Sequence, residues 1–329
     1  MQQKTKEQFK TAIGGQALIE GIMMRGPEKD AVVVRKDGQL QTEVKDRKFR
    51  SKKSVLSWPL IRGAVNFFDS QVCGVKALMR SADLSGELEE EEPSKFDKWL
   101  EKHLGAKGFE KLVVGIGVTL GLALSIALFF LLPMLVSSLL DGVIHSMLLI
   151  NLIEGAVRLT IFVLYMLLVS RMKEMRRVFS YHGAEHKTIR CYEAGLELTV
   201  ENVRNQTRLH PRCGTSFLLV VMVISILVFS VASTVLLQLV PQLELLRGQF
   251  LFKLIMVAFK LMLLPVVVAF SYEINRWAGR HDNWLTKIMT APGMWFQHFT
   301  TCEPDDTMIE VGIAALQAVL PAEEGADRW

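Results

Sequence analysis

Hydrophobic and polar residues alternate along this chain in long blocks. Four apolar blocks, at 112–136, 147–170, 215–240 and 250–272, are each long enough to cross a bilayer, which needs about 20 mostly apolar residues. The first block lies too far into the chain to be a cleavable signal peptide. The pattern therefore predicts a mainly α-helical, polytopic membrane protein with four transmembrane helices.

The N-terminal part of the chain has a β pattern. The runs 31–35 and 39–45 flank Asp37 and Gly38, and Asp-Gly between such runs is typical of a hairpin. Glycine is also dense across 14–26, which suits backbone that turns tightly or approaches another group closely. These patterns predict a small β unit.

The remaining segments predict helices and one linker. Residues 58–79 and 284–299 mix apolar with polar side chains, as interfacial amphipathic helices do. Residues 85–94 predict an acidic linker, and the acids at 303–306 favour the start of a last helix that runs to about 320. We therefore divide the chain into a β unit with an amphipathic helix (1–84), an acidic linker with a short helix (85–111), a four-helix transmembrane region (112–272) that includes a His/Cys loop (171–214), and C-terminal helices (273–329).

The charge distribution predicts the orientation of the spans. The formal net charge is only +4, but Lys and Arg are concentrated in the loop between the second and third blocks. The loop between the third and fourth has one such residue, and 141–146 has none. The nine in the central loop are Arg171, Lys173, Arg176, Arg177, Lys187, Arg190, Arg204, Arg208 and Arg212. The positive-inside rule places that loop and both termini in the cytoplasm, in a cell membrane. Without interleaved aromatics, the basic run does not indicate nucleic acid.

Three charged residues lie within the apolar blocks. Glu154 and Arg158 are four residues apart in the second block, and Lys260 is near the centre of the fourth. A charge at that depth costs at least about 2.5 kcal/mol on insertion scales, so we expect the three to face the bundle interior and to meet there. Two interpretations are open: the three residues form the polar centre of a transporter or assembly factor, or they form a purely structural group.

The central loop contains the strongest chemical pattern. In His182-Gly183-Ala184-Glu185-His186, the two histidines lie one helical turn apart with Glu185 beside them. Zinc peptidases use this His-x-x-Glu-His order, with the histidines as ligands and the glutamate as general base. His210, from a second piece of backbone, is the expected third ligand, and Cys213 or Glu193 is an optional fourth. The pattern predicts a divalent metal site, for which zinc is the best match, with Glu185 as the catalytic residue.

Several other residues are candidates for the same site. Glu193 shares the helical face of His186 but lies about 10 Å along the axis, so it could join only if the helix breaks or two ions bind. The alternative interpretation is a solvated loop whose histidines cap helices and pair with carboxylates. Substrate-binding or supporting candidates in the flanking segments are Glu20, Arg25, Asn66 and Glu303.

The motifs together resemble the YqhQ-like family of bacterial membrane proteins, a domain of unknown function with predicted metal-dependent activity. The resemblance covers about 13–316. It depends on the segments 14–21, 24–26, 181–188, 192–193, 210–217, 300–301 and 303–306, together with Arg62, Gly63 and Asn66. The family pattern has an arginine where this chain has Cys302. The resemblance implies a metal but no particular substrate.

Two functions follow from these patterns. The first is a metal-dependent membrane enzyme, a hydrolase with its site on the cytoplasmic face, whose evident partner is the lipid bilayer. The second is a non-catalytic transporter or assembly factor. A single pocket that joins the histidine cluster to the glycine-rich segment favours the enzyme, and a polar path through the spans favours transport.

The predicted topology is testable by cysteine labelling. We expect a cysteine placed in the loop 171–214 to resist an impermeant thiol reagent in intact cells, because that loop is cytoplasmic. Cysteines placed in the two short loops should react. Labelling of the long loop alone would contradict the orientation.

Overall fold

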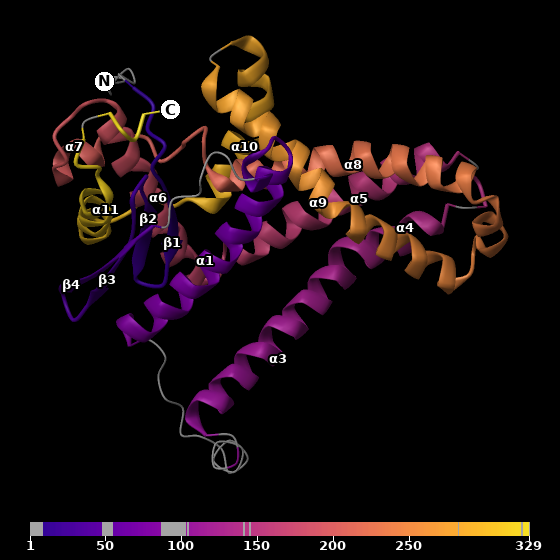
Figure 1. Ribbon diagram of the computed structural model, residues 1–329, viewed down its shortest axis with the longest axis horizontal. Helices are drawn as coiled ribbons and strands as arrows, with labels where there is room; N and C mark the ends of the chain where they lie inside the picture. The colour runs from indigo at the N-terminus through magenta and orange to yellow at the C-terminus, as the bar shows by residue number, and fades with distance from the viewer. Residues whose placement is uncertain are drawn as a thin grey trace. The chain divides into compact units, whose positions relative to one another are not determined.

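The computed structural model describes residues 9–47, 55–86, 103, 105–140, 142–144, 146–281, 283–323 and 325–328 (Figure 1). The chain forms two compact units. The first comprises the described parts of Met1–Glu87, Tyr165–Ile224 and Pro265–Trp329, and the second those of Leu88–Leu164 and Ser225–Leu264. Most of the predicted acidic linker, from residue 87, and most of the predicted short helix after it lie outside the described residues.

The first unit contains the predicted β unit, a four-stranded antiparallel sheet in the order β1-β2-β3-β4. Its strands are β1 (Gly14–Leu18), β2 (Gly21–Arg25), β3 (Lys29–Lys36) and β4 (Gln39–Asp46). Asp37 and Gly38 have positive φ angles of 50° and 78° between β3 and β4, which confirms the Asp-Gly hairpin. The glycine-rich segment forms the β1–β2 hairpin.

Helices cover both faces of the sheet. One face, with Ile22, Met24 and Val33, packs against α6 (Lys173–Glu193) and α11 (Asp306–Val319). The opposite face packs against Ala77 of α1 (Ile61–Ser85), because alternate strand residues point to opposite sides. Helix α6 begins at Lys173, so the N-terminal half of the predicted His/Cys loop is helical. Three shorter elements belong to the same unit: η1 (Val55–Ser57), α7 (Val200–Arg204) and α10 (Trp284–Thr300).

Four helices in the described part of the chain are long and apolar enough to cross a membrane. They confirm the prediction of four spans and define a multi-pass membrane protein. The first, Leu112–Ser138, is built from α3 (Ala106–Ile126), a π-helical turn η2 (Ala127–Leu131) and α4 (Leu132–Ser138). The others are α5 (Met147–Val169), α8 (Gly214–Leu239) and α9 (Phe250–Arg280), with η3 (Pro241–Leu246) between the last two.

The second unit contains a buried ion cluster. Arg158 donates from Nη2 to Glu154 Oε1 at 2.7 Å, one turn away on α5. Lys260 of α9 donates from Nζ to Glu154 Oε2 at 2.6 Å and to Asn151 Oδ1 at 3.3 Å. All four side chains are buried. The structure thus brings the three charged residues of the spans together.

The surplus positive charge of this cluster is offset by neutral groups. Pro133 has no N–H for the carbonyl of Phe129, four residues earlier, and the helix takes its π-helical turn here. Arg158 Nε donates to that carbonyl at 2.7 Å. The guanidinium also lies 5.1 Å from the ring centroid of Phe130 and 5.4 Å from that of Phe229. Cation–π contacts of this kind stabilise a desolvated guanidinium.

Glu154 should be the most sensitive member of this cluster. Glu154→Leu leaves two buried cations without a carboxylate, and we expect it to lower the free energy of unfolding in detergent by about 3–5 kcal/mol. The triple change Glu154→Leu, Arg158→Leu, Lys260→Met should cost less than the single one. Lys253→Met is the control, since that half-buried lysine bonds to Ser138 at 2.9 Å. Equal losses from the single and triple variants would contradict the pairing.

Candidate functional site

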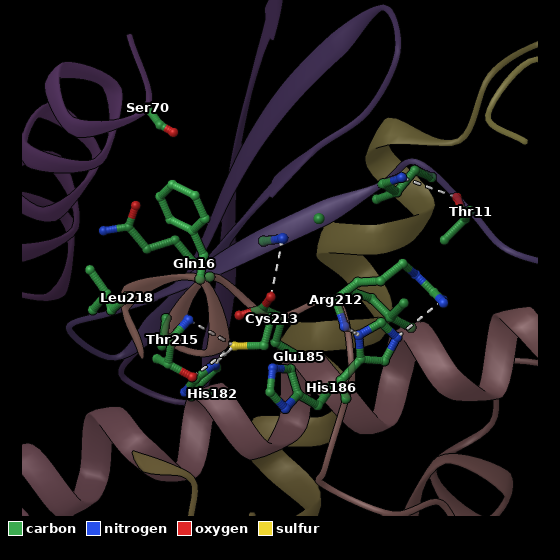
Figure 2. A pocket seen from close by; sticks show the side chains of 18 of the residues that line it. Thr11, Gln16, Ser70, His182, Glu185, His186, Arg212, Cys213, Thr215 and Leu218 are labelled. Carbon is green, nitrogen blue, oxygen red and sulfur yellow. Dashed lines mark hydrogen bonds between the residues drawn. The ribbon is translucent and has the colours of Figure 1, made fainter. Parts of the chain in front are cut away.

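Helix α6 directs three polar side chains toward a cavity in the first unit. His182, Glu185 and His186 are at positions i, i+3 and i+4, so they share one helical face. The cavity has a volume of about 540 Å³ and is lined by α6, β1, α1 and the segment that ends at Cys213. Figure 2 shows His182, Cys213 and Thr215 directed toward one another in its wall.

Backbone carbonyls orient both imidazoles. Nδ1 of His182 lies 2.8 Å from the carbonyl oxygen of Thr300, and Nδ1 of His186 lies 2.6 Å from that of Arg208. A carbonyl accepts only, so each Nδ1 carries a proton and each Nε2 is turned inward. Nε2 of His182 lies 3.2 Å from Cys213 Sγ, and Nε2 of His186 is buried without a hydrogen-bond partner in the described structure. Metal-binding histidines are held in this way.

The three inward-facing atoms form a compact donor group. Ligand atoms of His182, His186 and Cys213 all lie within 4.8 Å of one another. Burial alone would raise the pKa of the Cys213 thiol, but the two imidazoles outweigh it and hold that pKa well below its usual range. Burial would lower the pKa of His182, whereas the Cys213 thiolate raises it to about 9. A proton is thus shared between Cys213 and His182. A thiolate and an imidazole are also ligands that a divalent cation such as zinc prefers.

Cys213 is additionally stabilised by its position before a helix. It immediately precedes α8, and the backbone N–H of Thr215 donates to its sulfur at 3.4 Å. The Thr215 hydroxyl lies 3.2 Å from the same sulfur. A helix N-terminus favours the thiolate over the thiol. Sequence reasoning missed Thr215, although a Cys-Gly-Thr sequence at the start of an apolar block is a usable signal.

Glu185 occupies the wall between the histidines and β1. Its Oε1 accepts the Gly15 N–H at 3.1 Å, and its Oε2 is buried with no hydrogen bond in the described part of the chain. Burial raises the pKa of Glu185, and the two imidazoles act in the opposite direction. A Cβ on Gly15 would lie 2.8 Å from Glu185 Cδ, so only glycine allows this close approach.

The other two predicted ligands lie apart from this group. His210 Nε2 is 3.3 Å from Glu193 Oε2, and Arg212 pairs with the other oxygen of that carboxylate. Burial and the nearby Arg212 lower the pKa of His210 well below its usual value. Its ring centroid is 5.6 Å from that of His186. The structure therefore places Glu193 in a buried ion pair with Arg212, and the neutral His210 imidazole lies beside that pair.

The N-terminal candidates for substrate contact are engaged in pairs with other residues. Glu20 accepts from Arg177 and, at 3.2 Å, from the Tyr181 hydroxyl. Arg25 pairs with Asp30 at 3.3 Å and with Asp69 at 3.2 Å. Neither Glu20 nor Arg25 is among the residues that line the cavity.

The remaining two candidates are also outside the lining. Asn66 donates to the Tyr272 hydroxyl at 3.0 Å, and Glu303 pairs with Lys187. The lining residues of α1 that sequence reasoning missed are Phe67, Ser70 and Gln71. They share the amphipathic pattern of their helix and carry no separate signal.

The fold and this site define a multi-pass membrane protein with a buried His/Cys/Glu cluster at the start of one candidate span. The chain belongs to the family described as "Protein of unknown function (DUF1385)", whose model matches residues 58–322. It is 32% identical over 322 residues to "Uncharacterized protein YqhQ" of Bacillus subtilis (strain 168), an alignment that covers 97% of this chain and 95% of that protein. No solved structure matches the chain. The resemblance inferred from the motifs is confirmed.

The contact between β1 and α6 can be tested at two adjacent glycines. Gly15→Ala should lower the free energy of unfolding by about 1–3 kcal/mol, because the new methyl group overpacks against Glu185 and the Met23 carbonyl. Gly14→Ala is the matched control, since a Cβ there meets nothing within 4 Å. Equal stability of the two variants in thermal or chemical unfolding would contradict the close approach.

Proposed function

We propose that this protein is a metal-dependent membrane hydrolase, and that His182, His186 and Cys213 hold a divalent cation, zinc in preference to others. Two nitrogens and one thiolate are a donor set that suits zinc. Both histidines have their Nδ1 atoms fixed by carbonyls, which leaves Nε2 as the coordinating atom. The buried, unpartnered Nε2 of His186 carries the proposal, since burying a polar atom without a partner is costly.

Glu185 is the general base in this proposal. Gly15 holds one carboxylate oxygen at 3.1 Å, and the other is buried without a partner in the described part of the chain. That second oxygen is therefore the one available to accept a proton from water. Zinc in hydrolases supplies Lewis-acid chemistry, polarising the bond under attack and acidifying water. The Gly15 amide keeps the carboxylate oriented between steps.

The cavity favours a catalytic role over a purely structural metal. Structural zinc sites have four protein ligands, whereas catalytic ones have three and an open position. The donor group comprises three residues and borders the cavity of about 540 Å³. Residues 14–17 of the glycine-rich segment line the same cavity. This single pocket supports an enzyme. In the spans, by contrast, Arg158 and Lys260 each engage one oxygen of Glu154, and this pairing does not support a transport path.

The positive-inside pattern supports a cytoplasmic position for the site. The loop that carries His182, His186 and Cys213 has nine Lys and Arg residues, and Cys213 directly precedes a candidate span. We therefore propose a cell-membrane protein with both termini in the cytoplasm and its reaction at the cytoplasmic surface of the bilayer.

Metal content tests the ligand set directly. Protein purified without chelator should contain about one zinc ion per chain by elemental analysis. His182→Ala, His186→Ala and Cys213→Ala should each weaken zinc binding by more than about 100-fold, because each removes one of three ligands. His210→Ala and Glu185→Gln should retain the ion, as neither supplies a ligand in this arrangement. Thermal unfolding of each variant controls for misfolding.

Two results would overturn the proposal. One is wild-type protein that contains no transition metal and takes up none when zinc is added. The other is loss of zinc in His210→Ala as large as in His186→Ala. Cobalt(II) substitution gives a second readout. Thiolate-to-cobalt charge-transfer absorption should disappear in Cys213→Ser, while the absorption of cobalt bound by the two histidines remains.

A further inference from the structure

Strand β1 is at the edge of the sheet and forms part of the cavity wall. The strand order leaves β1 paired only with β2. Its residues Gly14, Gly15, Gln16 and Ala17 line the cavity together with Glu185 and the metal-ligand candidates. Gly15, Gln16 and Ala17 are half-buried, so no other element covers this edge completely. An edge strand beside a reactive centre is a template for pairing with another chain.

The hydrogen bond to Glu185 shows which groups of β1 point into the cavity. The Gly15 N–H donates to Glu185, so the polar groups of Gly15 are directed away from β2. In an antiparallel ladder alternate residues face the same side, and Ala17 therefore has the same orientation. Within the described part of the chain, no hydrogen bond engages the Gly15 carbonyl or the N–H and carbonyl of Ala17. The edge thus offers one donor and two acceptors.

We propose that these groups bind an extended peptide as an added β-strand, which makes a polypeptide the substrate of the proposed hydrolase. This inference depends on the proposed function, because it uses the same cavity and the same base. Free N–H and C=O groups on alternate residues repeat at about 6.8 Å, the spacing of an extended polypeptide. An acyl chain has no groups that pair with this repeat.

The opposite wall suits the side chains of such a strand. Phe67 of α1 and Phe217 of α8 lie with their ring centroids 6.1 Å apart, and Leu218 lines the same cavity. Ser70 and Gln71 add polar groups to this wall. Alternate side chains of the added strand would point toward this wall, which offers both apolar and polar groups. The start of α8 at a candidate span favours a substrate segment close to the membrane.

The reaction balances as simple hydrolysis. The C–N bond of one peptide unit breaks, the water oxygen bonds to the carbonyl carbon, and the products are a carboxylic acid and an amine. Glu185 accepts a proton from water and returns it to the leaving nitrogen. Because Gly15 bonds to Glu185, a peptide paired with β1 is held next to the base.

Binding of hydroxamate probes to the zinc-loaded full chain tests the substrate class. Acetohydroxamate reports the metal centre alone, and N-acetyl-Leu-Leu hydroxamate adds two peptide units. We expect the peptide probe to bind at least about tenfold more tightly by titration calorimetry, a gain that one or two backbone hydrogen bonds supply. Ala17→Pro removes the outward N–H and should remove most of this gain without changing acetohydroxamate binding. Proline is tolerated in an edge strand where its nitrogen faces outward.

Two controls keep the result interpretable. Ala17→Ser retains the N–H and should retain the gain. A peptide probe methylated on its amide nitrogens should lose the gain on the wild-type protein, which tests the pairing even if Ala17→Pro misfolds. A peptide probe no tighter than acetohydroxamate, or an octanohydroxamate that binds tightest and is insensitive to Ala17→Pro, would overturn the peptide inference. Absence of acetohydroxamate binding would instead refute the metal centre, and the inference with it.

Discussion

The hydrogen bond from Gly15 to Glu185 joins the sheet to α6, and the site depends on it. Helix α6 buries its apolar residues, such as Ala184, against the sheet and α11. His182, Glu185 and His186 instead line the cavity together with β1, and only a strand without a Cβ at position 15 can approach Glu185 this closely. Glu185 is held by this contact, and His182 and His186 are brought beside it by helical spacing. The cavity is a result of this arrangement.

The two imidazoles owe their orientation to backbone that is distant in the sequence. Thr300 is at the end of α10, and the following Cys302 N–H bonds to the Phe179 carbonyl of α6 at 2.8 Å. A Cβ on Gly183 would lie 2.1 Å from the Cys302 carbonyl oxygen, so the segment packs directly on the helix. The Thr300 carbonyl is thereby held within hydrogen-bond distance of His182 Nδ1. A side chain at position 302 is not needed for this contact, which is made by backbone.

The sequence predicted the elements more fully than the site. Apolar blocks and the Asp37-Gly38 turn were sufficient for the spans and the hairpin, because both follow from local pattern. The His-x-x-Glu-His spacing similarly indicated which side chains share a helical face. It could not separate Cys213 from His210, which are three residues apart in one loop. The backbone conformation there turns Cys213 toward His182 and His210 toward Glu193, and the tertiary contacts of Gln297 with His210 fix that choice.

The two buried polar centres of this protein differ in one physical respect. Around Glu154, both carboxylate oxygens have charged donors, and Arg158 is further engaged by a carbonyl and by aromatic rings. In such a cluster the carboxylate is neutralised on both oxygens, and stability is a sufficient reason for it. Around Glu185, one carboxylate oxygen and the Nε2 of His186 are buried without partners in the described structure. A folded chain tolerates such atoms where binding or catalysis requires them. Incomplete hydrogen bonding, more than charge or burial, therefore distinguishes the candidate catalytic centre from the structural one.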